Sequence, residues 1–364
     1  MRFPEFSGKW KETTLGKISE ITKGSGISKD QLSEQGSPCI LYGELYTKYK
    51  SEIIDEVYSR TESDSSSLVK SKANDVIIPC SGETAIDIST ARCVPFNNIL
   101  LGGDLNIIRL KHDDGGFFAY QLNGARKKDI ARIAQGVSVV HLYSENLKHI
   151  RVYHPAIEEQ KKITHLLSLI DERIATQNKI IEKLQSLIRG IAQNVARNNK
   201  PNIRLSECLE CSSSTLQESD VCETGTYPVY GANGIVGYID NYNTEKEAVY
   251  IIKDGSGVGA VSYVAGKCSA TGTLNTLQAT EGYSLQYLYY MLKVFNFEPY
   301  KTGMAIPHIY FKDYGKAKIF CPSYTEQLKY VGLLSVMDNK LSAEQSISTD
   351  LGLQKQYLLR QMFI

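Results

Sequence analysis

The sequence predicts an α+β fold in which two β-rich globular parts are joined by two long helices and related by an internal pseudo-twofold duplication. Two observations support this prediction. An apolar heptad pattern runs from Ile163 to Val195, and sliding the chain against itself at an offset of 167 superimposes this stretch on the end of the chain without a gap. A sustained heptad seam needs a partner helix, and self-similarity at a fixed offset indicates a duplicated structural unit. We therefore expect the two helices to form an antiparallel coiled coil.

The heptad seam defines the expected contacts between the helices. Steps of four and three from Ile163 give ten positions, nine of them apolar, with Gln177 as the exception. The second helix has a weaker seam with a polar middle, and its Glu344 matches Gln177 at the same offset. If the helices are antiparallel, these two polar positions should approach one another and fix the register. The residues expected to pair the helices are Ile170, Ile174, Gln177, Ile181, Leu184, Leu334, Met337, Leu341, Glu344 and Leu351.

The duplication also gives the domain boundaries. Each long helix is expected to open with the pattern P-x-x-x-E-Q, which starts at Pro155 and again at Pro322. The same offset pairs Gly136 with Gly303 and His141 with His308 before the helices. The chain therefore divides into a globular domain at 1–154, a helix at 155–198, a second globular domain at 199–321 and a second helix at 322–364.

Within the globular domains the offset is larger and falls along the chain. The segment TLGKISEITKG, expected to be helix-like, matches RLSECLECSSS at an offset of 190. The segments PCILYGELYTKY and YPVYGANGIVGYI both predict a strand, a glycine turn and a strand, at an offset of 188. VIIPCSGET matches YIIKDGSGVGAV at 174, and GGDLN matches TGTLN at 169. Length changes therefore cluster in loops, where binding residues are commonly found.

Composition is that of a soluble globular protein, with 42% hydrophobic residues, 22% charged residues and a net charge of +1. No apolar run reaches the length of a membrane span and no signal-peptide pattern is present, so a cytoplasmic location is expected. The eight cysteines are scattered, which is typical of reduced thiols. Cys208 and Cys211 form a C-x-x-C pair without a second pair, so free thiols are favoured over a zinc site.

Enzymatic motifs are missing from the sequence. It contains no P-loop, no HExxH and no G-x-S-x-G pattern. The glycines 255, 257 and 259 precede a strand-like segment, which favours a turn over a dinucleotide site. His141 and His308 lie among apolar residues and are expected to be packed structural histidines, although contact with a ligand is an alternative. The chain is therefore expected to bind rather than to catalyse.

The loops carry glycine, tyrosine, lysine, serine, threonine and asparagine, the residues that contact base edges and phosphates. Such loops also suit a protein-binding surface, so a two-domain scaffold that binds protein or glycan is the alternative. A net charge of +1 argues against an indiscriminate DNA coat. The candidate DNA-binding residues are Tyr42, Glu44, Tyr46, Thr47, Lys48, Ser81, Glu83, Thr84, Tyr230, Asn233, Lys253 and Ser256.

The order of these features resembles the specificity (S) subunit of type I restriction-modification enzymes, over essentially the whole chain. The resemblance rests on the two P-x-x-x-E-Q helices and on YGANGIVGY and GSGVG in the second domain. It implies that 1–154 and 199–321 are target recognition domains, each reading one half of a bipartite site in double-stranded DNA. It also implies that the helices act as spacers and dock two modification subunits, which are adenine methyltransferases.

The same resemblance implies a non-catalytic chain without a cofactor or metal of its own. The modification subunits would carry S-adenosylmethionine, and restriction subunits would use ATP and Mg. The polar middle of the second helix departs from the expected seam.

Overall fold

The computed structural model describes residues 2–64 and 66–363 and divides the chain into two compact units. The first unit comprises Met1–Asn178 and Ser346–Ile364, and the second comprises Lys179–Gln345. Two long helices, α6 (Ile157–Asn198) and α10 (Tyr324–Met362), contribute one part to each unit. The expected long helices are therefore present, and each unit is completed by parts of both.

The heptad seam is the buried stripe of α6. All ten seam positions are buried or half-buried, including Ile163, Leu167 and the polar Gln177. In α10 the seam continues through Leu334 and Leu341, which are buried, and through half-buried Glu344. The remaining residues expected to pair the helices are half-buried: Ile170, Ile174, Ile181, Leu184, Met337 and Leu351.

Within the first unit the parts of the two helices run antiparallel. Lys355 forms an ion pair with Asp171 at 2.5 Å, and Ser348 donates to Asn178 at 3.0 Å. Residue numbers rise along α6 while they fall along α10, which is the signature of an antiparallel pair. The predicted orientation is thus observed in this unit.

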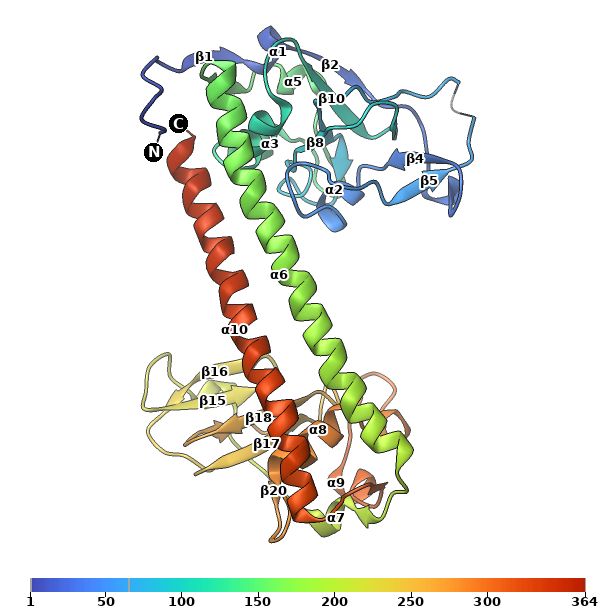
Figure 1. Ribbon diagram of the computed structural model, residues 1–364, viewed down its shortest axis with the longest axis vertical. Coiled ribbons are helices and arrows are strands. Elements are labelled where there is room, and N and C mark those ends of the chain that lie inside the picture. Colours follow the sequence, from blue (N-terminus) through green and yellow to red (C-terminus); the bar gives the residue numbers. More distant parts are fainter. Residues whose placement is uncertain (1, 65, 364) are drawn as a thin grey trace. The chain divides into compact units, whose positions relative to one another are not determined.

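The first unit contains two four-stranded sheets and two short strand pairs. The strand orders are β2-β10-β6-β8, β3-β5-β4-β9, β1-β12 and β11-β7. The core joins α3 to the first sheet and to both long helices, with Phe117, Val76, Leu167 and Leu358 among its members. Figure 1 shows α3 beside the green helix α6. Besides α6 and α10, the elements of this unit are β1 (Lys11–Thr14), α1 (Leu15–Ile18), β2 (Ser19–Lys23), η1 (Lys29–Gln31), β3 (Leu32–Ser33), β4 (Ser37–Ile40), α2 (Glu44–Thr47), β5 (Ser59–Thr61), β6 (Asp75–Pro79), β7 (Ser81–Gly82), β8 (Arg92–Val94), β9 (Leu100–Leu101), β10 (Leu105–Leu110), α3 (Gly115–Asn123), α4 (Lys127–Ile133), β11 (Val140–His141), α5 (Ser144–Leu147) and β12 (Arg151–His154).

The second unit repeats this plan with fewer strands. Its strand orders are β14-β20-β17-β18, β16-β15-β19 and β13-β21. The core joins α8 to the four-stranded sheet and to both long helices, through Leu288, Val249, Ile188 and Leu334. Besides α6 and α10, its elements are β13 (Ile203–Arg204), α7 (Leu205–Cys208), β14 (Leu209–Ser213), η2 (Glu218–Asp220), β15 (Tyr227–Gly231), β16 (Gly234–Ile239), β17 (Glu247–Ile252), β18 (Val261–Ala265), β19 (Ser269–Ala270), β20 (Leu274–Ala279), α8 (Leu285–Lys293), η3 (Glu298–Tyr300), α9 (Phe311–Tyr314) and β21 (Lys318–Ile319).

Strand pairing demonstrates the duplication in three dimensions. In the first unit Asn106 of β10 pairs with Lys23 of β2. In the second unit Asn275 of β20 pairs with Ser213 of β14. The offset between the two asparagines is 169 and the offset between their partners is 190, as expected from the sequence.

One expected offset is wrong by a single residue. Ile77 of β6 pairs with Ile107 of β10. The residue of the second unit that is equivalent to Ile107 is Thr276, and it pairs with Tyr250 of β17. The offset between β6 and β17 is therefore 173 rather than 174. A slip of one residue exchanges the two faces of a strand, so this correction changes which side chains are equivalent.

A second expected offset is wrong by two residues. In the first unit Ile40 pairs with Leu101, and in the second Tyr230 pairs with Ala270, both in parallel. The equivalent of Tyr230 is therefore Ile40, at an offset of 190, and not Tyr42. The shared Tyr-Gly dipeptide that suggested an offset of 188 is a coincidence.

Two local predictions are also corrected. The segment TLGKISEITKG is mainly strand: β1 and β2 flank the single helical turn α1. Pairing of β2 with β10 overrides the helical propensity of this short segment. After β4 the chain forms the short helix α2 instead of a second strand, whereas β15 and β16 form the expected hairpin.

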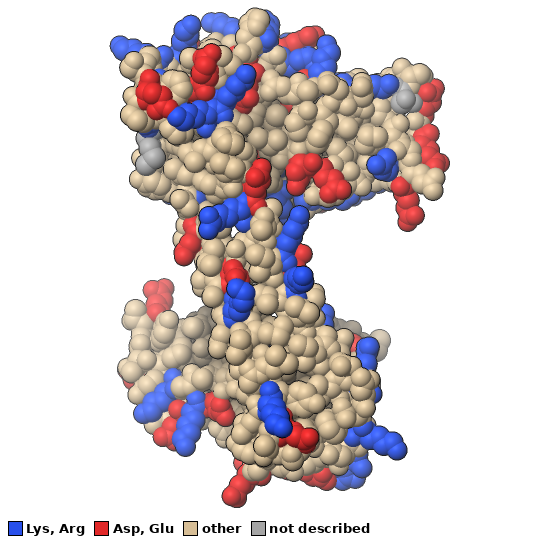
Figure 2. Space-filling model, viewed as in Figure 1, with Lys and Arg blue, Asp and Glu red and all other residues tan. Residues whose placement is uncertain are grey.

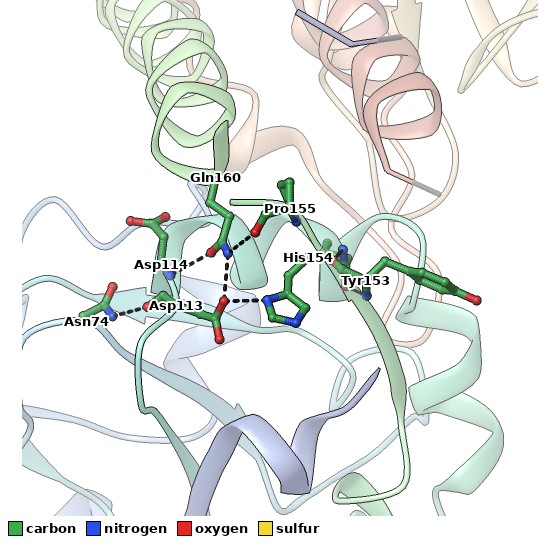
Figure 3. A network of polar contacts seen from close by, with 8 residues as sticks. Asn74, Asp113, Asp114, Tyr153, His154, Pro155 and Gln160 are labelled. Carbon is green, nitrogen blue, oxygen red and sulfur yellow. Dashed lines mark hydrogen bonds and ion pairs between the residues drawn. The ribbon is translucent and has the colours of Figure 1, made fainter. Parts of the chain in front are cut away.

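The glutamine of each P-x-x-x-E-Q pattern connects the start of a long helix to neighbouring segments by hydrogen bonds. The Gln160 amide donates to the Pro155 carbonyl at 3.0 Å and to Asp113 Oδ1 at 2.8 Å, and it accepts from the Asp114 N–H at 2.9 Å (Figure 3). Asp113 also binds His154 Nδ1 at 2.8 Å. Because Asp114 is the N-cap of α3, the network joins the starts of two helices.

The second unit uses the same fastening with fewer partners. The Gln327 amide donates to the Pro322 carbonyl at 2.9 Å and accepts from the Ser284 N–H at 2.8 Å. Ser284 is the N-cap of α8. The sequence pattern therefore has a structural cause in both repeats.

Candidate nucleic-acid interface

A groove of about 1490 Å³ in the first unit gathers most of the candidate residues of that unit. It lies between the segments 26–32, 41–48, 81–87, 102–104 and 138–139. Polar side chains with both donor and acceptor groups therefore face a common space. The candidates that line it are Tyr42, Glu44, Tyr46, Thr47, Lys48, Ser81 and Glu83.

Helix α2 presents the first set of side chains to the groove. Thr47 and Lys48 are exposed, and Tyr42 and Tyr46 are half-buried. Burial, assisted by the neighbouring Tyr42 and Asp87, raises the pKa of Tyr46 above its ordinary value. Its hydroxyl therefore stays neutral near pH 7 and can both donate and accept a hydrogen bond.

Glu44 has a structural role that was not expected from the sequence. Its carboxylate accepts from the Leu41 N–H at 3.0 Å, from Lys48 Nζ at 2.6 Å and from Ser59 Oγ. The residue is only 5% exposed. These three partners connect Glu44 to both ends of α2 and to β5, so the residue supports the position of α2.

Arg92 forms hydrogen bonds to the backbone at the C-terminal end of α2. Its guanidinium donates to the Leu45 carbonyl at 3.0 Å and to the Tyr49 carbonyl at 2.8 Å. Burial lowers the pKa of Arg92, against the opposing effect of Glu52 and Asp171. A planar guanidinium with two fixed acceptors sets the position of the segment that carries Tyr42–Lys48.

The second segment of the groove begins at β7. Ser81 pairs with His141 of β11, and the Cys80 N–H donates to the Asp104 carbonyl at 2.8 Å. Glu83 and Thr84 follow in an exposed turn. Thr84 is the one candidate of this unit that does not line the groove, and its hydroxyl donates to Asp87 at 2.6 Å.

In the second unit the four candidates lie at two places, on β15 with its hairpin turn and after the end of β17. Tyr230 is half-buried against the Tyr250 ring at 5.7 Å, and Asn233 occupies the exposed hairpin turn. Ser256 is exposed in the turn after β17. The Lys253 N–H donates to the Thr273 carbonyl at 3.0 Å, which repeats the bond from Cys80 to Asp104 in the first unit.

The two repeat-related histidines differ from the prediction of packed structural residues. His141 is exposed, and His308 is half-buried with Nδ1 at 2.6 Å from Asp254 Oδ1. Asp254 pairs with His308 as Ser81 pairs with His141, so aspartate and serine are equivalent. The one-residue error in the expected offset concealed this carboxylate.

The sequence prediction missed groove residues on three further segments, among them Lys29, Asp104, Ser138 and Val139. A signal existed for the last two. GVSVVHLY matches GMAIPHIY at an offset of 167 just before the helices, and that match identifies a loop present in both repeats.

Basic and acidic side chains are intermixed on the surface that Figure 2 shows. On the face shown in Figure 2, Lys and Arg alternate with Asp and Glu in each unit.

Burial raises the pKa of Cys208 to about 12 and that of Cys211 to about 11, so both thiols stay protonated near pH 7. Within the described residues no cluster of three or more His, Cys, Asp or Glu side chains is arranged to hold a metal. Among the described helices, none combines the length and apolarity needed to cross a membrane.

The chain is similar to known proteins over most of its length. A model of the type I restriction modification DNA specificity domain matches residues 7–186 and 201–351. A putative type I specificity subunit of Mycoplasma genitalium is 24% identical over 270 residues, which are 68% of this chain and 70% of that protein.

Two solved structures share the fold. The S subunit of a type I restriction-modification system from M. genitalium has a TM-score of 0.71 and 19% identity, covering 100% of this chain and 99% of that one. A chain from a type I system studied for its complex assembly and conformational transition has a TM-score of 0.54 and 15% identity, covering 98% and 97%. With the domain match on both repeats, the chain belongs to the family of the type I restriction modification DNA specificity domain.

Proposed function

We propose that this chain reads a bipartite sequence in double-stranded DNA, one half with each unit, as the specificity subunit of a type I restriction-modification complex. One observation carries the proposal. Two units with equivalent backbone hydrogen bonds present different side chains at equivalent positions, such as Ser81 and Asp254. A common framework with two sets of loops suits two half-sites of different sequence.

In the first half-site, the groove supplies the reading groups. Neutral Tyr46 and exposed Thr47 offer donors and acceptors to base edges, and Lys48 reaches the phosphates. Lys48 is 47% exposed, so its ammonium can contact a phosphate while it keeps the buried Glu44 carboxylate and Ser59 Oγ as partners. In the second half-site, Asn233, Lys253 and Ser256 take the corresponding roles.

The long helices dock the modification subunits. Exposed apolar residues recur on them at repeat-related positions: Leu169 with Val336, and Ile180 with Ile347. Equivalent apolar contacts on both repeats suit two copies of one partner. These partners transfer methyl groups from S-adenosylmethionine to adenine, and restriction subunits add cleavage that depends on ATP and Mg. The chain itself contributes recognition and no catalytic group.

An exchange of domains tests the proposal. Residues 199–321 are replaced by the matching region of another specificity subunit, and the chimera is expressed with the modification subunit. Sequencing of methylated adenines should show one altered half of the motif and one unchanged half. A chain that binds protein or glycan instead would leave no methylated motif, and a change in both halves would contradict independent reading.

Filter binding provides a second measurement. The complex with the modification subunit should bind its motif with an affinity that falls steeply as salt rises, because phosphate contacts release counterions. Binding without salt dependence would favour the protein or glycan scaffold.

A further inference from the structure

Each unit contains a tight loop about 20 residues before the start of a long helix: residues 136–140 before α6 and residues 303–307 before α10. Two backbone hydrogen bonds close each loop. Gln135 and His141 exchange them at 2.9 and 2.7 Å, and Thr302 and His308 exchange them at 2.9 and 2.7 Å. The loops are therefore the same structure built twice, once in each repeat.

A glycine fixes the shape of each loop. Gly136 has φ +121° and Gly303 has φ +91°, which favour glycine over any L side chain. A Cβ at Gly136 would lie 2.1 Å from the Val139 carbonyl oxygen, and one at Gly303 would lie 2.3 Å from that of Ile306. With both bonds and the glycine in place, the backbone at the base of the loop is fixed before any partner binds.

The tips expose apolar side chains at matching positions. Val137 is 97% exposed and Met304 is 107% exposed; Val139 and Ile306, two residues later, are 53% and 57% exposed. A single exposed apolar residue is ordinary on a protein surface. The same pair on the same loop in both repeats indicates a contact that each unit makes once.

The surroundings identify that contact. In the first unit Ser138 and Val139 line the groove beside Ser81, and β11 leads directly from the loop into its pairing with β7. In the second unit Gly255 donates to the Pro307 carbonyl at 3.0 Å, and Ile309 donates to that of Lys253 at 2.9 Å. Each loop is thus fastened to a segment that carries candidate DNA contacts.

We infer that these two loops place Val137 and Met304 against the apolar surfaces of DNA bases, one loop in each half-site. The inference rests on the proposed function. An aliphatic or thioether side chain offers nothing to a phosphate, whereas the thymine methyl group and the face of an opened base step are apolar. A loop whose base is already fixed loses less freedom on binding. Val137 and Met304 therefore contribute to specificity at positions that polar side chains do not read.

The test replaces methyl groups with polar groups of similar size: Val137→Thr and Met304→Gln. Both positions are exposed, so thermal unfolding should be unchanged. Each variant is assembled with the modification subunit and titrated with the duplex that the wild-type complex methylates. A methyl group withdrawn from water corresponds to about a fourfold change in affinity, so a loss of about fourfold or more is expected. The salt dependence should stay as in the wild type, because no phosphate contact is lost.

Each variant serves as the control for the other. Duplexes with the first or the second half-site scrambled measure discrimination at each half separately. Val137→Thr should reduce discrimination at the half-site read by the first unit alone, and Met304→Gln at the other alone. Duplexes with uracil for thymine identify a methyl contact, since the wild type should then lose more affinity than either variant. 2-Aminopurine fluorescence identifies an opened base step. The fluorescence of a labelled duplex should rise when the wild-type complex binds it, and this rise should vanish with the variant.

Other results overturn the inference. Wild-type affinity and methylation in both variants would remove the loops from the interface, while the proposed function would stand. Loss of assembly with the modification subunit would assign the loops to a protein contact. A wild-type complex without specific DNA binding would overturn both the inference and the proposed function.

Discussion

Replacing Lys355 with methionine should destabilise the first unit strongly. The Lys355 ammonium lies 2.5 Å from both Glu52 and Asp171, and the three side chains are only 14%, 9% and 7% exposed. The Tyr120 hydroxyl donates to the same aspartate at 2.7 Å. Removing Lys355 takes away the cation that contacts both buried carboxylates and leaves Arg92 as a positive charge near them, and breaking such a buried ion pair costs about 3 to 5 kcal/mol of unfolding free energy.

The loss should depend on pH in a defined direction. Burial and the nearby Glu52 raise the pKa of Asp171, and Lys355 opposes this rise. Without the lysine, the pKa of Asp171 rises further. A carboxyl group with a higher pKa in the folded state holds its proton more tightly there, so stability increases as pH falls from above the folded pKa toward the unfolded value. The destabilisation should therefore be largest at pH 8 and smaller at pH 5.

The single tryptophan makes the measurement specific to this unit. Trp10 packs against Phe117 and Phe363 with ring centroids at 5.6 and 6.4 Å. Its fluorescence during urea unfolding reports the first unit. Lys148→Met is the matched control, because Lys148 forms only an exposed ion pair with Glu145, worth about 0.3 to 0.5 kcal/mol at most.

A neutral cluster should recover much of the loss. The triple variant adds Glu52→Gln and Asp171→Asn to Lys355→Met, so both carboxylates are neutralised together with the lysine, and buried Arg92 keeps its bonds to the Leu45 and Tyr49 carbonyls. An unchanged Trp10 transition in Lys355→Met, or a loss that is the same at pH 5 and pH 8, would refute the assignment of a buried three-residue charge cluster.

Three other predictions concern recognition. Arg92→Met should loosen segment 42–48 and lower discrimination at the first half-site by about 1 to 3 kcal/mol, measured by titration with base-substituted duplexes; equal discrimination would remove Arg92 from this role. Lys253→Met should weaken binding to all sequences alike and reduce the salt slope by about one if the lysine contacts phosphate; a sequence-dependent loss would make it a base contact. One heptad inserted after Gln177 and one after Glu344 lengthen each helix by about 10 Å. The methylated motif should then gain about three unread base pairs between unchanged half-sites if helices and duplex lie side by side, and an unchanged spacer would show that the helices do not set it.

The long helices could be predicted because their signal is redundant. The heptad seam specifies a helix and its buried face, and the constant offset of 167 identifies its partner. The seam positions of α6 are buried or half-buried, even polar Gln177. Here local periodicity and tertiary packing give the same answer.

The register of the β-strands could not be predicted because their sequences lack an alternation of apolar and polar residues. All five residues of Asp75–Pro79 are buried, so β6 lacks the alternation that marks one face of a half-buried strand. VIIP and YIIK then match equally well at neighbouring offsets. An error of one residue hid the equivalence of Ser81 with Asp254, and with it the ion pair of His308.

Helix α2 shows a signal that was present and not used. Glu44 and Lys48 have the spacing of an i,i+4 ion pair, which favours a helical turn, and the structure forms this pair at 2.6 Å. The other partners of Glu44, Ser59 and the Leu41 N–H, are brought to it by the tertiary fold. The helix was therefore accessible from the sequence, and the burial of its carboxylate was not.

The separation of framework from side chain explains how one fold can serve two half-sites. The carbonyl of residue 80 accepts from Leu142, and the equivalent carbonyl of residue 253 accepts from Ile309, so the backbone between them is positioned alike. Backbone bonds do not depend on side-chain identity, so a serine at position 81 and an aspartate at position 254 are tolerated by the same framework. In the second unit the aspartate binds His308, whereas His141 of the first unit has a serine at that position. A substitution at such a position changes the side chain without moving the loop, so under the proposed function the two half-sites can differ while the fold stays the same.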